Sequence, residues 1–290
     1  MDEHKSLAHR FEQRRSRLRA VAYRVLGSLS EADDAVQEAW LRLSGTAHDD
    51  VDDLGAWLTT VVTRISLNML RSRKTRSEIR VPEPIIDRSD GTNPEHAALL
   101  ANGVGLALMV VLETLVPAER VAFVLHDIFG IPFEEVARIL ERTPDAARQL
   151  ASRARRRVQA RNATSAPDAE VQRSVVEAFR AASQDGDFDR LVAVLDPEVV
   201  CRGHAGAMLA GRTTEVRSAE LVARQAQNFS RLALLRRLVL VNGAAGLLVT
   251  FEGKPFAVMA FVIKSGKIAE IDIIRDPERL RHLDLTLLDD

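Results

Sequence analysis

The strongest constraint on the fold comes from residues 132–161, which carry two helical patterns separated by a tight turn. Residues 133–140 predict a short amphipathic helix, and residues 141–143 predict the turn that follows it. Thr143 is a favourable N-cap residue, Pro144 suits the first position of a helix, and Asp145 suits its positive end. The pattern therefore predicts a helix-turn-helix.

The second of these helices has two different faces. Its small apolar face suits close helix packing and consists of Ala147, Leu150, Ala151, Ala154 and Val158. The other face is rich in long donors and consists of Asp145, Arg148, Gln149, Ser152 and Arg156. Such side chains are suited to the major groove of DNA. On this segment alone, a solvated basic helix with an arginine-rich end stays open as the alternative.

Positive charge is concentrated locally rather than spread over the chain. The formal net charge is only -1, which argues against a general polyanion binder. One basic cluster lies at residues 71–80 and the other at residues 148–161, and two clusters predict two separate contacts with nucleic acid. The single cysteine, Cys201, excludes an internal disulfide and a cysteine-based zinc site. We expect neither a metal nor a cofactor.

The pattern of helices and strands divides the chain into three blocks. Residues 8–77 and 96–161 are helical, and residues 78–95 form a linker whose prolines favour extended or irregular backbone. The sequence shows neither a signal peptide nor an apolar run of transmembrane length, so we expect a cytoplasmic protein.

The third block, residues 168–290, changes character along its length. Two helical segments are predicted at 169–183 and 188–195. Strand-like runs follow at 237–241, 246–251, 256–263 and 268–274. Asn242-Gly243, Glu252-Gly253 and Ser265-Gly266 separate these runs and are typical of hairpin turns. We therefore expect an α+β domain with a curved antiparallel sheet, covered on both faces or enclosing a pocket.

Several motifs resemble bacterial sigma factors, and they occur in the order that the family has. Residues 30–43 (SEADDAVQEAWLRL) closely resemble its polymerase-binding helix, and residues 53–64 (DLGAWLTTVVTR) resemble the start of the next helix. Residues 123–130 (FVLHDIFG) through 148–155 (RQLASRAR) resemble its C-terminal DNA-binding region. With only these two regions, residues 8–161 resemble the extracytoplasmic-function type, the most compact sigma factors.

The third block resembles a SnoaL-like domain of the NTF2-like superfamily, which is fused to such sigma factors in one recognisable group. Val81-Pro82-Glu83-Pro84 resembles the group's Trp-Leu-Pro-Glu-Pro linker motif but lacks the tryptophan. Asp276-Pro277-Glu278-Arg279-Leu280 resembles its Asn-Pro-Asp-Lys-Leu motif, with Asn and Asp changed and Lys replaced by Arg. The group's Asp-Gly-Gly-Gly-Lys motif is not matched, and residues 202–206 stand near its place.

The resemblance implies four groups of functional residues. Core RNA polymerase would bind an acidic face with an apolar edge, made by Asp33, Asp34, Gln37, Glu38 and Leu41. The −10 promoter element would contact Asn68, Arg71, Arg73 and Lys74. The −35 element would contact Asp145, Arg148, Gln149, Ser152, Arg153, Arg155 and Arg156. Regulatory contacts would be made by Val81, Pro82, Glu83, Pro84, Asp276, Pro277, Glu278, Arg279 and Leu280.

The leading hypothesis is a sigma factor that directs promoter-specific initiation and is modulated in cis by its C-terminal domain, without enzymatic activity. The alternative is a DNA-binding regulator whose C-terminal domain is a small-molecule sensor or an enzyme. An enzyme would draw on Asp196, His204 and Asp272, although nothing in the sequence brings them together. A conventional repressor is disfavoured, because it would have no use for a polymerase-binding helix.

Overall fold

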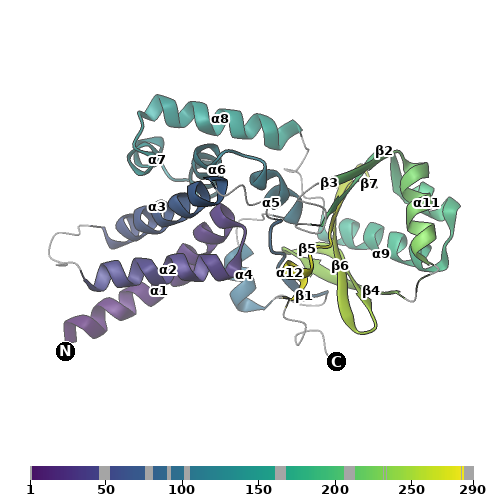
Figure 1. The fold of residues 1–290 in the computed structure, drawn as a ribbon, viewed down its shortest axis with the longest axis horizontal. Helices are drawn as coiled ribbons and strands as arrows, with labels where there is room; N and C mark the ends of the chain where they lie inside the picture. The colour runs from purple at the N-terminus through teal and green to yellow at the C-terminus, as the bar shows by residue number, and fades with distance from the viewer. Residues whose placement is uncertain are drawn as a thin grey trace. The chain divides into compact units, whose positions relative to one another are not determined.

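The computed structural model describes residues 2–45, 53–75, 81–89, 93–100, 105–160, 168–205, 213–230, 232, 234–281 and 283. The side chains of residues 2–5, 74–75, 94 and 98 are outside this description. The chain divides into two compact units (Figure 1). The first comprises Met1–Glu78, Ala97–Asn102 and Val111–Arg161, and the second comprises Ile79–His96, Gly103–Val110 and Asn162–Asp290.

Three long helices begin the first unit, and each packs against the other two. They are α1 (Asp2–Leu26), α2 (Leu29–Ser44) and α3 (Leu54–Thr75). The inward face of α2 is buried and consists of Ala32, Ala35, Val36, Ala39 and Leu43. The start of α3 is fixed by Asp53, whose carboxylate accepts hydrogen bonds from the backbone amides of Gly55 and Ala56 at 2.8 and 3.1 Å. These bonds lower the pKa of Asp53.

The predicted helix-turn-helix is confirmed in the same unit. After α4 (Pro94–Leu100) and α5 (Leu106–Glu113), the chain forms α6 (Pro117–Phe123), the π-helical turn η2 (Val124–Ile128), α7 (Phe133–Leu140) and α8 (Pro144–Ala160). The Thr143 hydroxyl accepts a hydrogen bond from the amide of Ala146 at 3.2 Å, as expected of an N-cap. The buried residues of α8 are Ala147, Ala151, Ala154 and Val158, and the helix packs on α6 and α7.

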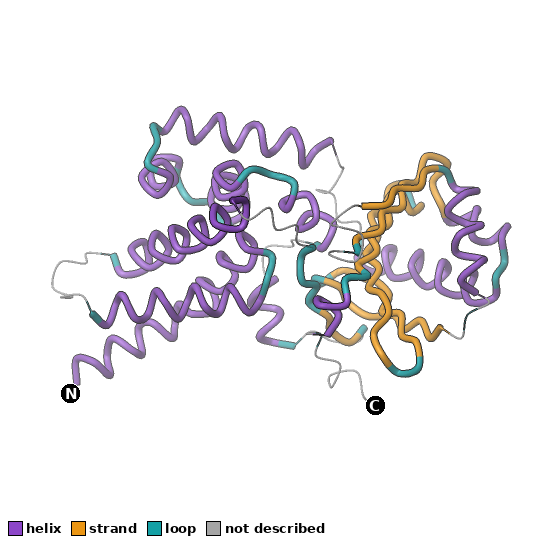
Figure 2. The backbone as a smooth tube through the Cα atoms, in the orientation of Figure 1, coloured by secondary structure: helices purple, strands orange, loops and turns teal. Residues whose placement is uncertain are grey.

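The second unit is built on a seven-stranded sheet of order β1-β4-β5-β6-β7-β2-β3. Its strands are β1 (Ile86–Arg88), β2 (Leu195–His204), β3 (Thr213–Arg217), β4 (Leu234–Val241), β5 (Ala244–Phe251), β6 (Lys254–Lys264) and β7 (Lys267–Ile274). All pairings are antiparallel except that of β2 with β7. Figure 2 shows the strands gathered in this part of the chain.

All four predicted strands and the three hairpin turns between them are confirmed. Asn242-Gly243, Glu252-Gly253 and Ser265-Gly266 have positive φ at both residues, as two-residue hairpin turns require. β2, β3 and the short β1 were not predicted. β1 comes from the proline-containing linker and pairs with β4 in the register Ile86↔Val241.

Helices cover one face of the sheet. They are α9 (Ala169–Asp185), which packs on β4 and β5, α10 (Phe188–Val194) and α11 (Ala219–Ser230), which packs on β2. A last short helix is α12 (Pro277–Arg281). The core beneath α9–α11 includes Phe179, Leu191, Val199, Leu247, Phe261 and Ile271. The predicted fold class, two all-α regions followed by an α+β domain, is confirmed. Within the described residues, no helix is long and apolar enough to cross a membrane.

Candidate nucleic-acid and partner interfaces

The outward face of α2 presents one exposed apolar side chain among acidic and amide groups. Asp34 and Gln37 are exposed, and Leu41 is 56% exposed although it is large and apolar. Glu38 is half-exposed and bonds to Arg42 one turn along at 3.0 Å. Asp33 differs from the others, because its carboxylate lies 2.7 Å from Arg19 of α1 and joins the two helices.

The residues at the end of α3 that were predicted to contact the −10 element differ in their exposure to solvent. Asn68 and Arg71 are exposed. Arg73 corrects the prediction, because its side chain is buried, donates to the carbonyl of Leu26 at 2.8 Å and pairs with Glu31. It joins α3 to the junction of α1 and α2 instead of facing DNA. Lys74 lies in α3, but its side chain is outside the described residues.

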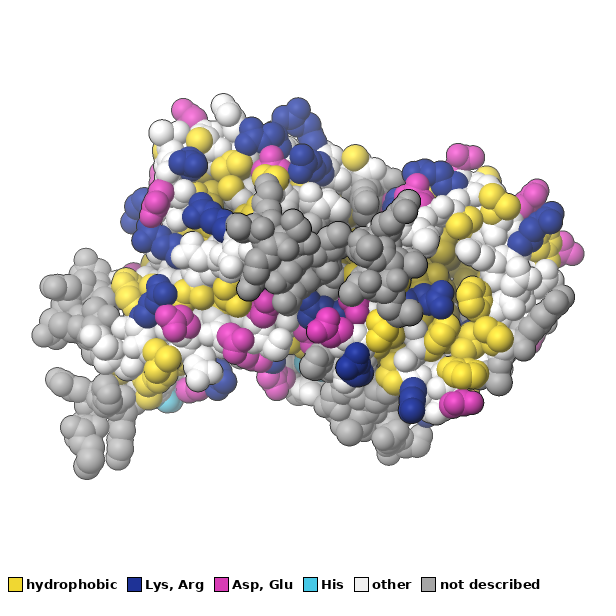
Figure 3. Space-filling model, in the orientation of Figure 1, with side chains coloured by type: hydrophobic (Ala, Val, Ile, Leu, Met, Phe, Trp, Pro, Cys, Tyr) yellow, Lys and Arg dark blue, Asp and Glu magenta, His cyan; other side chains and the backbone are white. Residues whose placement is uncertain are grey.

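The outward face of α8 presents a polar stripe. Asp145, Arg148, Gln149 and Arg156 are exposed, and Ser152 is partly buried. Arg148 is oriented by Asp145 at 2.7 Å and Glu134 at 3.0 Å, and its guanidinium lies 5.5 Å from the ring centre of Phe133. Figure 3 shows Lys and Arg side chains gathered over α8.

A second set of arginines on α8 is tied to acidic residues of the same unit. The carboxylate of Glu119, which is buried, receives Arg153 at 2.8 Å and Arg157 at 3.0 Å, and Asp127 pairs with Arg155. Arg153 and Arg155 were predicted to contact DNA, whereas the structure shows that they also attach α8 to α6 and η2. Glu119 was missed, because a lone acid near the start of a helix gives no sign of a distant partner.

The two motifs that were predicted to be regulatory meet in the second unit. Residues 81–84 are all buried, and Glu83 lies 3.5 Å from Arg279, with both side chains at most 10% exposed. Asp276 caps α12 by accepting a hydrogen bond from the amide of Glu278 at 3.0 Å. Arg279 and Leu280 are buried, while Pro277 and Glu278 are exposed.

Two of the three residues considered for catalysis do come together. His204 and Asp272 lie 2.8 Å apart and are buried, whereas the carboxylate of Asp196 accepts a hydrogen bond from the amide of Glu198. Side chains alternate along a strand, and Ile271 and Ile273 on either side of Asp272 point toward the helices. The His204–Asp272 pair therefore lies on the opposite face of the sheet.

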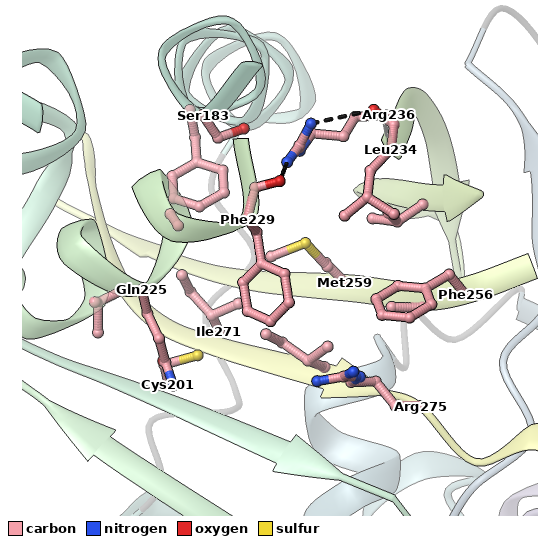
Figure 4. A pocket seen from close by; sticks show the side chains of 16 residues that line it. Ser183, Cys201, Gln225, Phe229, Leu234, Arg236, Phe256, Met259, Ile271 and Arg275 are labelled. Carbon is pink, nitrogen blue, oxygen red and sulfur yellow. Dashed lines mark hydrogen bonds between the residues drawn. The ribbon is translucent and has the colours of Figure 1, made fainter. Parts of the chain in front are cut away.

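On the helix-covered face, the sheet and helices line a partly open cavity of about 90 Å³ (Figure 4). Most of its lining is apolar and includes Phe179, Val222, Phe229, Phe256, Met259 and Ile271. Its polar lining residues are Ser183, Cys201, Gln225, Arg236 and Arg275. Burial raises the pKa of the Cys201 thiol to about 12, and burial lowers the pKa of Arg236.

Comparisons with known proteins identify the family to which the chain belongs. Residues 10–76 match the family model of Sigma-70 region 2, and residues 105–158 match that of Sigma-70 region 4. The ECF RNA polymerase sigma factor SigJ of Mycobacterium tuberculosis is 37% identical, over 93% of this chain and 91% of the relative. The probable sigma factor SigI of the same species is 33% identical, over 98% of each chain.

A solved structure extends this similarity to the whole fold. The crystal structure of Mycobacterium tuberculosis SigJ has a TM-score of 0.76 and 35% identity, and covers 96% of this chain and 99% of that one. The resemblance that the sequence motifs suggested is thus confirmed along nearly the full length. The chain belongs to the extracytoplasmic-function RNA polymerase sigma factors, which direct core polymerase to promoter DNA.

Proposed function

We propose that the outward face of α2 is the surface that binds core polymerase. The observation that supports this is Leu41, which is 56% exposed beside Asp34 and Glu38. An exposed large apolar residue beside polar groups is typical of an anchor that is desolvated on binding.

Run-off transcription with core polymerase tests the surface. Leu41→Arg should abolish initiation and polymerase binding, whereas Leu221→Arg, a similarly exposed leucine on α11, should leave both unchanged. Full initiation by the Leu41→Arg protein would show that polymerase binds elsewhere.

We further propose that α8 reads the −35 element through Arg148, Gln149, Ser152 and Arg156. Arg suits guanine and Gln suits adenine in the major groove, and Arg148, Gln149 and Arg156 are exposed on the outward face of α8. Arg153 and Arg155 serve mainly to position the helix, because the carboxylates that pair with them are at most 18% exposed, whereas those beside Arg148 are at least 64% exposed. Asn68, Arg71 and Lys74 are the proposed contacts to the −10 element.

We propose that the C-terminal domain regulates initiation in cis through the pair Glu83–Arg279. The linker that carries Glu83 connects the two promoter-binding regions along the chain, so a contact that fixes the linker affects both. A partner within the same chain is present at high effective concentration, and even a weak contact is then sufficient.

Charge reversal tests this regulation in the same transcription assay. Glu83→Arg and Arg279→Glu should each change the yield of transcript, and the double variant should return it toward the wild-type level. Glu278→Arg, on the exposed side of α12, is the matched control. Single variants that transcribe like the wild type would contradict the proposal.

A second candidate function for the C-terminal domain is the sensing of a small molecule, which would add to the sigma activity. The cavity beneath α9–α11 favours it, because it is mostly apolar and contains a few polar groups, as ligand sites commonly do.

A further inference from the structure

The cavity continues into a wider hollow at the end of the sheet. The hollow has a volume of about 720 Å³, and Gln225, Phe256 and Arg275 line both spaces. Residues of α12, namely Pro277, Leu280 and Arg281, form part of its wall. A molecule in the inner cavity would therefore extend toward α12.

The two spaces differ in chemistry. The inner cavity is dominated by phenylalanine, aliphatic and methionine side chains, and this lining favours an apolar group. Arg236 contributes charge, but its guanidinium already donates to the carbonyls of Phe229 and Leu234 at 3.1 and 3.2 Å. Figure 4 shows these two hydrogen bonds on a different side of the pocket from Arg275.

The charged residues that line the two spaces are positive, and Arg275 is the one that lines both. The charged residues among the described ones that line them are Arg236, Arg275, Lys254 and Arg281, and none is acidic. The Arg275 guanidinium lies over two aromatic rings, 4.7 Å from the centre of Phe256 and 5.7 Å from that of Phe229. No carboxylate in the described part of the chain pairs with it.

Stacking orients a guanidinium and leaves the donors at its edge available. A planar arginine fork matches a carboxylate with two parallel hydrogen bonds, and a preoriented fork loses little freedom when it binds one. A cation would meet like charge here, and a neutral molecule would leave the arginine without a partner.

We propose that this site binds a small organic carboxylate whose apolar body fills the inner cavity and whose carboxylate binds Arg275. The backbone amide of Arg275 donates to the carbonyl of His204 at 2.8 Å, and this hydrogen bond holds the backbone of Arg275 against β2. Asp276, the next residue, caps α12, whose Arg279 pairs with Glu83 of the linker. Any effect of the bound carboxylate on transcription through α12 and the linker rests on the proposed regulation in cis, whereas the binding itself does not.

Calorimetric titration of the full chain with octanoate, 1-octanol and octylamine tests the site. Octanoate should bind at least tenfold more tightly than 1-octanol, and octylamine should bind most weakly. From hexanoate to octanoate, each added methylene that enters the cavity should tighten binding about fourfold. Equal affinity for the acid and the alcohol, or no binding of either, would overturn the proposal.

Two variants and a matched control locate the carboxylate. Arg275→Gln should weaken octanoate at least tenfold and leave 1-octanol unchanged. Arg224→Gln should change neither, although Arg224 also stacks on an aromatic ring, 5.9 Å from the centre of Phe188. Ala226→Phe, which fills the cavity from α11, should weaken the acid and the alcohol alike. Octanoate binding by Arg275→Gln at wild-type strength would exclude Arg275 as the anchor.

The titrations contain no polymerase, so their result is separate from that of the Glu83 and Arg279 variants. If octanoate does not bind but those variants alter transcription, the ligand proposal is wrong and the proposed regulation in cis stands. If octanoate binds but the Glu83 and Arg279 variants leave transcription unaltered, the ligand site stands and its proposed effect through the linker is wrong.

Discussion

At the scale of single residues, the neighbours of an arginine decide its role. Arg73 is buried against Glu31 and the carbonyl of Leu26, Arg153 lies half-exposed on Glu119, and Arg156 is exposed with no partner among the described residues. All three occur in basic clusters that the sequence assigned to DNA. The sequence shows where basic residues cluster, but it could not separate structural arginines from those facing solvent, because the acids that pair with them are distant in sequence.

This difference predicts opposite effects of two alanine substitutions in α8. Arg156→Ala removes a proposed base contact, so it should weaken binding of the polymerase holoenzyme to promoter DNA by about 1–3 kcal/mol. The free energy of unfolding should stay unchanged. Arg153→Ala should lower the free energy of unfolding by roughly 1 kcal/mol, a modest loss because the side chain is half-exposed. Thermal unfolding and DNA titration together measure both. Equal stability of the two variants would contradict this division.

The buried thiol gives a prediction about pH. Burial raises the pKa of Cys201 from its ordinary 9.0 to about 12, so the folded protein retains the thiol proton where the unfolded chain releases it. The contribution of Cys201 to stability should therefore decline as the pH rises from 9 toward 12. At pH 8 the thiol should react with a disulfide reagent only after denaturant is added. Rapid labelling of the native protein would contradict this.

At the scale of elements, local signals explain which strands were predictable. β4 to β7 are apolar runs joined by two-residue turns, and the turn residues themselves indicate the hairpins. β2 was missed because it follows α10 directly, contains Pro197 and carries the buried polar residues Arg202 and His204. Its partner β7 lies parallel and far along the chain, so no turn signals the pairing. The same separation hid the His204–Asp272 contact.

Close approach within the sheet predicts a sensitive position in β5. A methyl group at Gly246 would lie 2.5 Å from a methyl carbon of Val241 and 2.6 Å from the carbonyl oxygen of Met259. Because backbone cannot move aside readily, Gly246→Ala should lower the free energy of unfolding by about 1–3 kcal/mol. Gly253→Asn is the control, since that turn has open space and asparagine tolerates its positive φ. Denaturant titration measures both, and equal losses would contradict the steric explanation.

At the scale of the whole molecule, the linker is the feature that sequence reasoning described least completely. Its prolines correctly indicated extended backbone, but nothing local showed that it joins the sheet. Ile85 exchanges two hydrogen bonds with Asn242, one to the side-chain oxygen at 3.1 Å and one from the backbone amide at 2.8 Å, and β1 follows directly. A segment between two promoter-binding regions is thereby held by the C-terminal domain.

Asn242 allows this attachment to be weakened without breaking the hairpin. Asn242→Gly retains the positive φ of the turn but removes the side-chain oxygen that accepts from Ile85. Amide hydrogens of residues 81–88 should then exchange faster, on the order of tenfold for the loss of about 1 kcal/mol. Glu252→Gly, the same change in the next turn, should leave their exchange unaltered. Under the proposed regulation, only the Asn242 variant should also change transcript yield. Faster exchange with unchanged transcription would show that linker attachment does not control initiation.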